Sequence, residues 1–556
     1  MKKEQHVFGL HKMAVFLSNS LNKVWGIPTS QRGLKTAWTL DLSSTTTSSS
    51  STNHVLVHGT ANANAIVHGI NGGTNSHEFL VLSMTDTQVH WHCVDGTSGT
   101  VHAKGSTNTM ASPIAQIIPV FGEDASCRQA AVLLHKDRSV SIVPQDSTGI
   151  VMAQLQSTKN GFHTHYVDRE LGVLESYQIV TSDTSESGFE TQVVGQSSFV
   201  GETVLGVSYP QRDEAVQSPS AILGDDSLLL KYLNPHIAVI ITTTGPPALT
   251  TAQDSSALFK ALSSIKGSNK DSVAGKRKPK GASKPGDAAT DASAQAVSED
   301  IPNLFVNVVD TVSGRILYRV SHTNAVVDKP VPAVITENWI IYAFMNQKSA
   351  RTELGVLTLY EGMIDKAGLT AFKTPGQTLS FSSLDSRESK PIVLPKTYTI
   401  VKPVTALGVS STRGGISTRQ LLIASGDNRL TAIKRALLEP RRPTGNVKEH
   451  EKQEGLYQYT PLVPLISMTS PSYNQTVEGV SSIIAAPAAL ESSSLMLAYG
   501  GPDIFFTRLT PSKGFDMLPE SFNRPLLSIV VVGLLVAVFV VRNMSSSKTV
   551  KMGWVS

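Results

Sequence analysis

The chain has 556 residues, a formal net charge of +4 and 17% charged residues. This length can form one to four domains, and the weak charge imbalance gives no electrostatic argument for a nucleic-acid partner. Forty-one glycines, 28 prolines and abundant Ser, Thr and Val indicate β structure with many turns. Two cysteines occur, Cys93 and Cys127. An oxidising compartment would permit them to pair, but their spacing does not establish a disulfide.

The amino end begins with two lysines and contains no uninterrupted apolar core of signal-peptide length. Two explanations stay open. Either an apolar stretch near the C-terminus is the only targeting signal, or the chain lacks an upstream portion.

A repeated hairpin pattern runs from about residue 13 to residue 320. An apolar strand, an Asp, Ser or Thr turn, a glycine and a second strand recur around Gly33, Gly99, Gly149, Gly188 and Gly314. Glycine takes the positive φ that a tight turn requires, and Asp or Ser caps the turn. Two of the intervals approach the roughly 40 to 50 residues of a propeller blade. The pattern favours a β-propeller over a sandwich, with residues 1–265 as propeller-like blades, although unrelated hairpins would give the same signal.

Two polar segments interrupt this pattern. Residues 43–51 are Ser and Thr only, which predicts a loop. Residues 266–300 are rich in Lys, Ser, Ala and Gly, and are predicted to be a disordered insertion. Their basic run at 275–284 is similar to a nuclear localisation or nucleic-acid patch, but a solvated insertion is the preferred interpretation, with no nucleic-acid partner.

The following region, 301–521, also has the pattern of strands. Strong strands are predicted at 337–348 and 352–363, two more with a glycine turn between 405 and 424, and further β structure between 468 and 506. One or two helical turns are expected at 432–443, before a proline. The predicted fold class is therefore mainly β, with region 301–521 completing the blades.

Near the C-terminus, Pro525 to Val541 form seventeen consecutive uncharged, mostly apolar residues. At about 1.5 Å per residue such a helix spans roughly 25 Å, close to the ~30 Å core of a bilayer. We expect a transmembrane helix over 525–543, the alternative being a buried core helix or strand. Gly533 and Ala537, a small-xxx-small pair, are its expected helix-packing face.

Basic residues follow this stretch. Arg542, Lys548 and Lys551 have no acidic neighbour, so the positive-inside rule predicts a short cytosolic tail over 544–556 and places the preceding residues in the lumen or outside the cell. The sequon at Asn474 would then be a glycan acceptor, and the sequon at Asn543 would stay unmodified.

Histidines offer the strongest alternative chemistry. His90 and His92, and His163 and His165, alternate along predicted strands, so each pair could present two imidazoles to zinc. No acid or further cysteine pattern completes such a set, and surface histidines are the preferred interpretation. No nucleophile elbow, phosphate loop or HExxH motif occurs, so we predict neither catalysis nor a cofactor. A quinone-dependent dehydrogenase is kept as a third hypothesis, because its hairpins are similar, although its adjacent cysteines are missing.

Several blocks of the C-terminal half resemble the family of ER membrane protein complex subunit 1. They are ENWIIYAFMNQKSARTEL, LTLYEG, FSSLD, TRGGISTRQLLIA, ALLEPRRP, YNQTV and AYGGPDIFFTRLTPSKGFDML, followed at once by the apolar stretch. The blocks keep the order and spacing of the family over residues 225–545. FGLHKMAVFLSNSLNKVWGI is similar more loosely. Family members are longer and begin with a signal peptide and further propeller, so the resemblance favours an N-terminally incomplete member.

The resemblance implies a scaffold without catalytic activity in the endoplasmic reticulum membrane, with a single span and a lumenal propeller. Its partners would be the other subunits of the complex, client membrane proteins and the lipid bilayer. The complex would insert tail-anchored and multi-pass proteins and assist their folding. The alternative is a membrane-anchored propeller receptor for lumenal or extracellular cargo.

Charged residues in the matching blocks are candidates for structural or docking roles. Each arginine could join blade to blade through carboxylate or carbonyl contacts, and bracing within the propeller is preferred to subunit docking. These candidates are Arg413, Arg419, Arg441, Arg442, Asp503 and Arg508, and Asp516 is similarly ambiguous.

Overall fold

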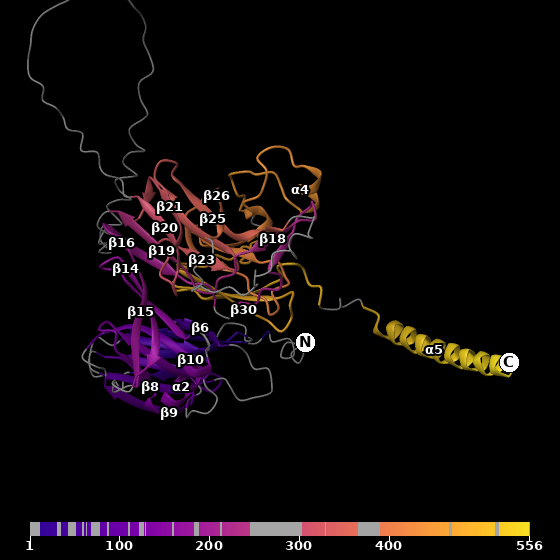
Figure 1. Cartoon of the computed structure of the whole chain (residues 1–556), viewed down its shortest axis with the longest axis horizontal. Helices are drawn as coiled ribbons and strands as arrows, with labels where there is room; N and C mark the ends of the chain where they lie inside the picture. The colour runs from indigo at the N-terminus through magenta and orange to yellow at the C-terminus, as the bar shows by residue number, and fades with distance from the viewer. Residues whose placement is uncertain are drawn as a thin grey trace, which may run out of the picture. The chain divides into compact units, whose positions relative to one another are not determined.

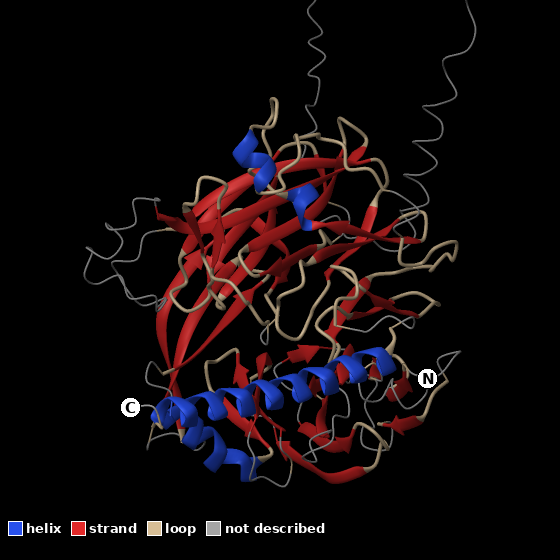
Figure 2. Cartoon of the chain, turned by 90° about the vertical axis from the view of Figure 1, so that its right-hand side faces the viewer, coloured by secondary structure: helices blue, strands red, loops and turns tan. Residues whose placement is uncertain are grey.

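A computed structural model describes most of the chain as a β-rich body followed by one long helix (Figures 1 and 2). The described residues are 10, 12–29, 35–42, 52–57, 60–62, 64–67, 78–85, 88–108, 112–121, 127, 129–157, 161–182, 188–211, 214–244, 303–327, 330–364, 390–465, 470–516 and 522–554. The predicted loop at 43–51 and the predicted insertion at 266–300 lie outside them. Two compact units result, Met1–Pro511 and Ser512–Ser556.

The first unit consists, in its described residues, of eight antiparallel sheets, numbered here in chain order. Sheet 1 contains β1 (Met13–Ser18), β2 (Lys23–Pro28), β3 (Trp38–Asp41) and β6 (Asn64–Val67), and sheet 2 contains β4 (Thr52–Val57), β5 (Thr60–Asn62), β7 (Glu78–Met84), β8 (Gln88–Asp95) and β9 (Val101–Asn108). Sheet 3 contains β10 (Ile114–Phe121), β11 (Gln129–His135) and β12 (Val140–Val143), and sheet 4 contains β13 (Phe162–Asp168), β14 (Val173–Thr181) and β15 (Phe189–Ser198).

Sheets 5 to 8 complete this unit. Sheet 5 contains β16 (Glu202–Ser208), β19 (Ile237–Thr244), β20 (Leu304–Asp310) and β21 (Ile316–His322), and sheet 6 contains β17 (Ser220–Ile222), β18 (Leu228–Lys231), β22 (Ala325–Val326), β23 (Ala333–Thr336), β24 (Trp339–Asn346), β25 (Arg351–Ile364) and β26 (Ile392–Ile400). Sheet 7 contains β27 (Val404–Val409), β28 (Gln420–Ser425) and β29 (Arg429–Lys434), and sheet 8 contains β30 (Ser482–Pro487), β31 (Ser494–Tyr499) and β32 (Phe505–Leu509).

Buried apolar clusters join these sheets into a closed ring. Seven clusters each combine residues of two sheets that follow one another in the chain, from sheets 1 and 2 to sheets 7 and 8. The eighth joins the last sheet to the first, where Ala14 of β1 packs with Ala486 and Leu497, and the Phe16 ring meets the edge of Tyr499 at 5.8 Å. Apolar burial therefore closes the ring, and the mainly β propeller prediction is confirmed.

Three of the five predicted hairpins occur, and the turn predicted around Gly33 lies outside the described residues. Gly99, Gly188 and Gly314 have φ of 71°, 75° and 68°, and they lie in the turns after β8, β14 and β20. Positive φ is only one constraint on Gly99, because a Cβ there would also lie 2.6 Å from the Trp38 ring of the neighbouring sheet.

The hairpin predicted around Gly149 is wrong. After β12, Pro144 cannot donate to a sheet, and the chain continues as η1 (Gln145–Ser147) and α2 (Thr148–Ser157). Val151 and Leu155, spaced by one helical turn, pack on the cluster between sheets 3 and 4. Burial of these two side chains against that cluster favours the helix over the β-like composition of this stretch.

The order of strands along the chain also links sheets 5 and 6. The segment between β16 and β19 of sheet 5 contains two strands, β17 and β18, that belong to sheet 6. Strand β18 pairs there with the C-terminal end of β25. Strands β19 and β20 pair in unbroken register although residues 245–303 separate them in the sequence (Figure 1). The predicted insertion therefore lies within one blade and not between two domains.

Among the described residues of this unit, two other short helices occur, η3 (Arg435–Leu438) and α4 (Glu449–Gln453). The helical turn expected before Pro440 is confirmed by η3.

The second unit contains α5 (Arg524–Gly553), a continuous helix of 30 residues (Figure 2). Its segment Pro525–Lys548 is long and apolar enough to cross a membrane, and none of its side chains is buried inside the structure. At about 1.5 Å per residue those 24 residues span roughly 36 Å, more than the ~30 Å core of a bilayer. The helix continues through much of the stretch expected to form the tail.

Candidate functional site

A cavity in the first unit is lined by strands from several of its sheets. Its volume is about 1080 Å³. The wall is formed largely by β10, β13, β16, β23, β27 and β30, which belong to six different sheets. Within the described residues each of these strands pairs with a strand on one side only, so its other backbone edge faces away from its own sheet. Such a ring of strand edges can bind a ligand through backbone groups as well as side chains.

A polar group from two sheets lies on this wall. His165 Nε2 of β13 is 2.9 Å from the Tyr209 hydroxyl, which follows β16, and the two rings are 5.2 Å apart. Burial raises the pKa of Tyr209 to about 12, although the Arg169 cation opposes the rise. The Tyr209 side chain is nevertheless half exposed. Tyr209 is therefore an accessible residue of the cavity wall.

A buried charge cluster lies beside the cavity. Glu337, in the turn between β23 and β24, accepts hydrogen bonds from Lys231 Nζ at 2.9 Å, Arg419 Nε at 2.9 Å and Arg435 Nη1 at 3.0 Å. Arg419 also pairs with Glu214 at 3.0 Å. The Glu337 and Arg419 side chains are only 7% and 5% exposed. The cluster therefore connects three parts of the chain: the segment between β16 and β17, the turn between β23 and β24 of sheet 6, and the residues next to β28 and β29 of sheet 7.

The electrostatics of this cluster follow from its three cations. Burial by itself would raise the pKa of Glu337, but the Arg435 and Lys231 charges and the hydrogen bonds from Lys231 and Arg419 lower it to about 2. Glu214 is held at the same time, since it accepts the Glu337 backbone N–H at 2.9 Å and the Thr336 hydroxyl. Glu337 is therefore ionised at neutral pH, and hydrogen bonds from neighbouring groups hold both carboxylates in place.

The carboxylate of Glu491 connects sheets 7 and 8 through hydrogen bonds, and we call this group of bonds the Glu491 clasp. Glu491, in the loop before β31, accepts backbone N–H groups of Gly414, Ile416 and Ser417 at 2.6 to 3.0 Å and the Thr412 hydroxyl at 2.8 Å. These hydrogen bonds lower the pKa of Glu491 against the opposing effect of burial. One side chain therefore fixes the glycine-rich loop of the neighbouring sheet.

The structure places the predicted arginines in several environments. Arg442 is buried and donates hydrogen bonds to the carbonyls of Leu437, Tyr457 and Gln458. These bonds connect the residues before α4 with those that follow it. Arg441 binds Glu439 at 3.1 Å and Glu454 at 2.6 Å.

The remaining charged candidates lie elsewhere. Arg508 donates to Ser493 Oγ within sheet 8, and Asp503 accepts the Glu478 backbone N–H at 2.9 Å. Arg413 is exposed on the loop that Glu491 fixes, and Asp516 lies in the second unit. Only Arg419 is part of the cavity wall.

Sequence reasoning missed the partners of Arg419. Glu214, Lys231, Glu337 and Arg435 are distributed over more than two hundred residues of sequence, and no short motif connects them. The left-handed φ of 49° at Glu337, in a tight turn directly before a buried strand, becomes visible only in the structure.

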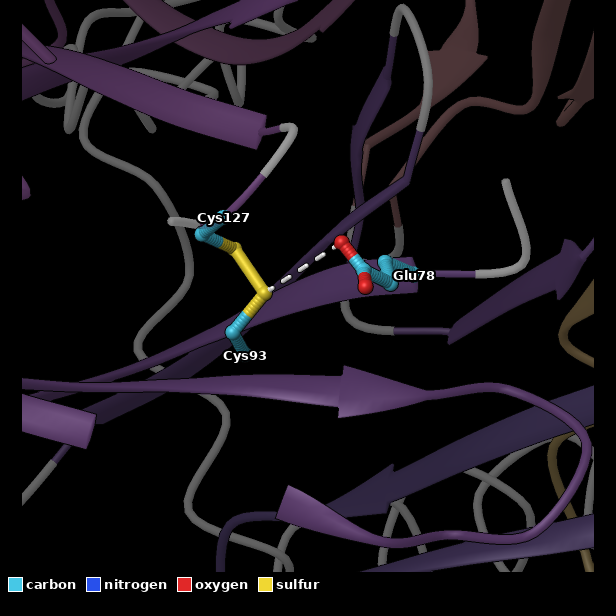
Figure 3. Close-up of a disulfide and its surroundings, with 3 residues drawn as sticks. All are labelled: Glu78, Cys93 and Cys127. Atoms are coloured by element: carbon cyan, nitrogen blue, oxygen red, sulfur yellow. Dashed lines mark hydrogen bonds between the residues drawn. A yellow bond between two sulfur atoms is a disulfide. The ribbon is translucent and has the colours of Figure 1, made fainter. Parts of the chain in front are cut away.

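A disulfide joins sheets 2 and 3. Cys93 of β8 is bonded to Cys127, which precedes β11, and the Glu78 Oε2 atom lies 3.9 Å from Cys93 Sγ (Figure 3). Because a disulfide sulfur has no proton to donate, the Glu78 contact does not share a proton. The pairing left open by the sequence is therefore formed, and it connects two adjacent blades covalently.

The paired histidines belong to two different sheets. His90 and His92 lie on β8, and His163 and His165 lie on β13 and line the cavity. Burial lowers the pKa of His92 to about 4, which favours its neutral form. Within the described ranges, no group of three or more His, Cys, Asp or Glu side chains is arranged to hold a metal ion.

The other predicted sites are accessible. Asn474 is exposed on the loop that precedes β30. Gly533 and Ala537 lie one turn apart on α5, and a Cβ at Gly533 would meet no atom within 4 Å. Their surroundings leave room for a packing partner.

Comparison with known proteins shows which family these features belong to. The model of the family described as "ER membrane protein complex subunit 1, second beta-propeller" matches residues 9–273 and 288–512. ER membrane protein complex subunit 1 of Xenopus laevis is 28% identical over 444 residues, which are 80% of this chain and 38% of that protein. The Schizosaccharomyces pombe protein of the same name is 30% identical over 255 residues, 45% of this chain and 28% of the relative. The chain thus spans less than two fifths of these relatives.

Solved structures also include similar propellers. The WD40 domain of SCAP from fission yeast covers 91% of this chain and 93% of its own, with 7% identity and a TM-score of 0.26. The Dos1 propeller covers 87% of this chain and 73% of its own, with 8% identity and a TM-score of 0.30. These two similarities carry no argument about function. The family match extends over most of the chain, including all eight sheets, and the chain therefore belongs to the ER membrane protein complex subunit 1 family.

Proposed function

We propose that this chain is a scaffold subunit of an ER membrane protein complex, on whose lumenal propeller other subunits assemble. The observation that carries the proposal is the family match over residues 9–273 and 288–512. In this role the complex inserts tail-anchored and multi-pass proteins into the membrane and assists their folding, and this chain supplies a docking platform without catalytic activity.

The internal bracing of the ring supports a platform role. Neighbouring sheets are fixed to each other by the Glu337 cluster, by the Glu491 clasp and by the Cys93–Cys127 bond. A propeller braced in this way presents broad surfaces that change shape little when partners bind. Low reorganisation on binding favours assembly, because less conformational entropy is lost.

Affinity purification tests the proposal directly. The tagged full chain is solubilised in mild detergent, and the proteins recovered with it are identified by mass spectrometry. We expect the other subunits of the complex in stoichiometric amounts and client membrane proteins in smaller amounts. Recovery of the chain without those subunits would refute the scaffold role.

The orientation of the chain is part of the proposal. We place α5 across the ER membrane with the propeller in the lumen, as a single-pass type I protein. Asn474 then carries a glycan, and Asn543, within α5, does not. A mobility shift on deglycosylation that Asn474→Gln abolishes and Asn543→Gln leaves intact fits this topology, and the opposite result contradicts it.

The span contributes to assembly through its small residues. Gly533 and Ala537 allow a neighbouring helix to approach closely, since interfaces in membranes are enriched in small side chains. Replacing both with Leu is expected to reduce recovery of the other subunits. The matched control replaces Val532 and Val536 with Leu, which alters a different face at the same spacing. Equal recovery from both double variants would exclude this packing face.

A further inference from the structure

The apolar part of α5 is bounded by an arginine at each end. Seventeen uncharged residues, Pro525 to Val541, lie between Arg524 and Arg542, and Ser528 is the only one of them with a polar side chain. The helix is continuous from Arg524 to Gly553, so the 18 positions from one arginine to the other correspond to about 27 Å along its axis. Two charged residues therefore set the thickness of hydrocarbon that α5 can occupy.

The residues that follow Arg542 do not lengthen this apolar part. The segment that is long enough to cross a membrane continues to Lys548, but its end contains Arg542, Asn543, three serines and Lys548. The Ser546 and Ser547 hydroxyls both donate to the Asn543 carbonyl at 2.9 Å, within the helix. Charged, amide and hydroxyl groups of this kind suit the headgroup region better than the hydrocarbon. The apolar part is therefore shorter than the whole segment.

The distance between the two arginines agrees with one class of bilayer. The hydrocarbon core of the ER membrane is about 27 Å thick, and that of the plasma membrane is about 32 to 33 Å thick. A span that is too long for its bilayer can tilt. A span that is too short must thin the bilayer or bring flanking charges toward the hydrocarbon, and both cost free energy. The length of α5 therefore disfavours thick bilayers specifically.

We propose that α5 selects bilayers with a hydrocarbon core of about 27 Å and so retains the chain in the ER membrane. The span is then a retention determinant as well as an anchor, and its ligand is the lipid bilayer itself. The inference rests on the proposed function only for the identity of the membrane. The preference for thickness is a property of α5 and can be measured separately.

Thiol reactivity of the full chain in vesicles tests this preference. Cys93 and Cys127 are the two cysteines of the chain and are bonded to each other, so Asn543→Cys introduces a single free thiol. The vesicles contain phosphatidylcholines with monounsaturated acyl chains of about 14 to 22 carbons, which vary the hydrocarbon thickness around 27 Å. N-ethylmaleimide crosses the bilayer, so it reaches the thiol in both orientations of the chain. We expect the reaction to slow about tenfold once the core is thicker than the apolar part of α5, because a thiol drawn into hydrocarbon does not ionise.

Two insertions into this single-thiol chain make the outcome specific to the length of the apolar part. Leu, Val, Leu and Val inserted between Val541 and Arg542 increase the separation of the arginines to about 33 Å and should move the loss of reactivity to bilayers about 6 Å thicker. This insertion leaves Gly533 and Ala537 in place. The matched control carries Ser, Asn, Ser and Asn after Lys548, which adds the same number of residues without changing the separation, and it should behave as the parent chain. If the parent and the apolar insertion lost reactivity at the same acyl length, or if the parent reacted equally in all vesicles, the proposal would be wrong.

Surface biotinylation of cells tests retention. The full chain is expressed in excess of the other subunits, so that unassembled chains are observed, and the same two insertions are compared. We expect several-fold more of the apolar insertion at the cell surface than of the wild type or the polar control. An apolar insertion that is retained like the wild type would overturn retention by the span. Wild-type chain at the surface would instead refute the ER location that belongs to the proposed function.

Discussion

Replacing Glu337 with Gln is expected to be among the most destabilising isosteric changes in the ring. The carboxylate accepts hydrogen bonds from Lys231, Arg419 and Arg435 at 2.9 to 3.0 Å, and its side chain is 7% exposed. The amide keeps the shape of the side chain but removes its negative charge. The positive charges of Lys231, Arg419 and Arg435 are then compensated within the cluster by Glu214 alone.

The magnitude follows from the pKa of Glu337. Lowering it from 4.5 to about 2 corresponds to about 3 kcal/mol at neutral pH, at roughly 1.4 kcal/mol for each unit. The burial of the side chain means that solvent screening reduces this figure little. Uncompensated buried cations give a similar loss, on the order of 3 to 5 kcal/mol. We therefore expect a loss of about 3 kcal/mol for Glu337→Gln.

The same shift predicts how stability depends on pH. The pKa of Glu337 is lower in the folded chain than in the unfolded chain, so the unfolded state binds more protons between the two values. The contribution of Glu337 is therefore complete above about pH 5 and is lost progressively as the pH falls toward 2. Glu337→Gln removes this part of the acid sensitivity, so the difference in stability between variant and wild type should narrow in that interval.

Urea unfolding of the full chain in detergent measures the effect through tryptophan fluorescence. Trp339 is a suitable reporter, since the Arg435 guanidinium lies 5.5 Å from its ring centre. The control is Glu449→Gln, whose carboxylate is 81% exposed and pairs with Lys452 at 3.5 Å. An exposed pair of this kind contributes about 0 to 1 kcal/mol. If the two variants unfolded at the same urea concentration, the assignment of Glu337 as a stabilising centre would be wrong.

Two further predictions concern the packing and crosslinking of the blades. Gly355→Ala should destabilise the chain by about 1 to 3 kcal/mol, because its Cβ would lie 2.2 Å from the Tyr342 ring, whereas Gly362→Ala on the same strand has nothing within 4 Å and should be close to neutral in thermal unfolding. Replacing Cys93 and Cys127 together with Ser should lose about 3 to 4 kcal/mol, since the bond spans 34 residues, and reducing agent should then leave the unfolding midpoint of the variant unchanged. A midpoint of the wild-type chain that does not respond to reducing agent would contradict the second prediction.

The features predicted best from the sequence are those determined by nearby residues. Turns at Gly99, Gly188 and Gly314 follow from the conformational freedom of glycine between two apolar strands. The apolar helix after Pro525 follows from a single uninterrupted run. The failure at Gly149 is also local, since Val151 and Leu155 fit a helix and a strand about equally well until the packing surface is known.

The candidate site was accessible to sequence reasoning only in fragments. Arg419 was singled out, but its partners come from distant parts of the chain. Glu214 lies in the segment that connects β16 of sheet 5 with β17 of sheet 6, and Glu337 lies in the turn between β23 and β24 of sheet 6. The cavity is equally non-local, because six strands from six sheets form its wall. Closure of the ring between the first and last sheets depends on small residues such as Ala14 and Ala486, whose contact has no signature in sequence.

The pairing of β19 with β20 has a consequence for how much the length of this chain can vary. Thr243 and Leu304 are register partners, so the intervening residues begin and end side by side. Closing a loop whose ends already meet costs only about 0.6 kcal/mol more for each doubling of its length. Sequence can therefore be gained or lost at this hairpin without disturbing the blade. A compact reporter domain placed there would label the protein internally and leave both of its ends untouched.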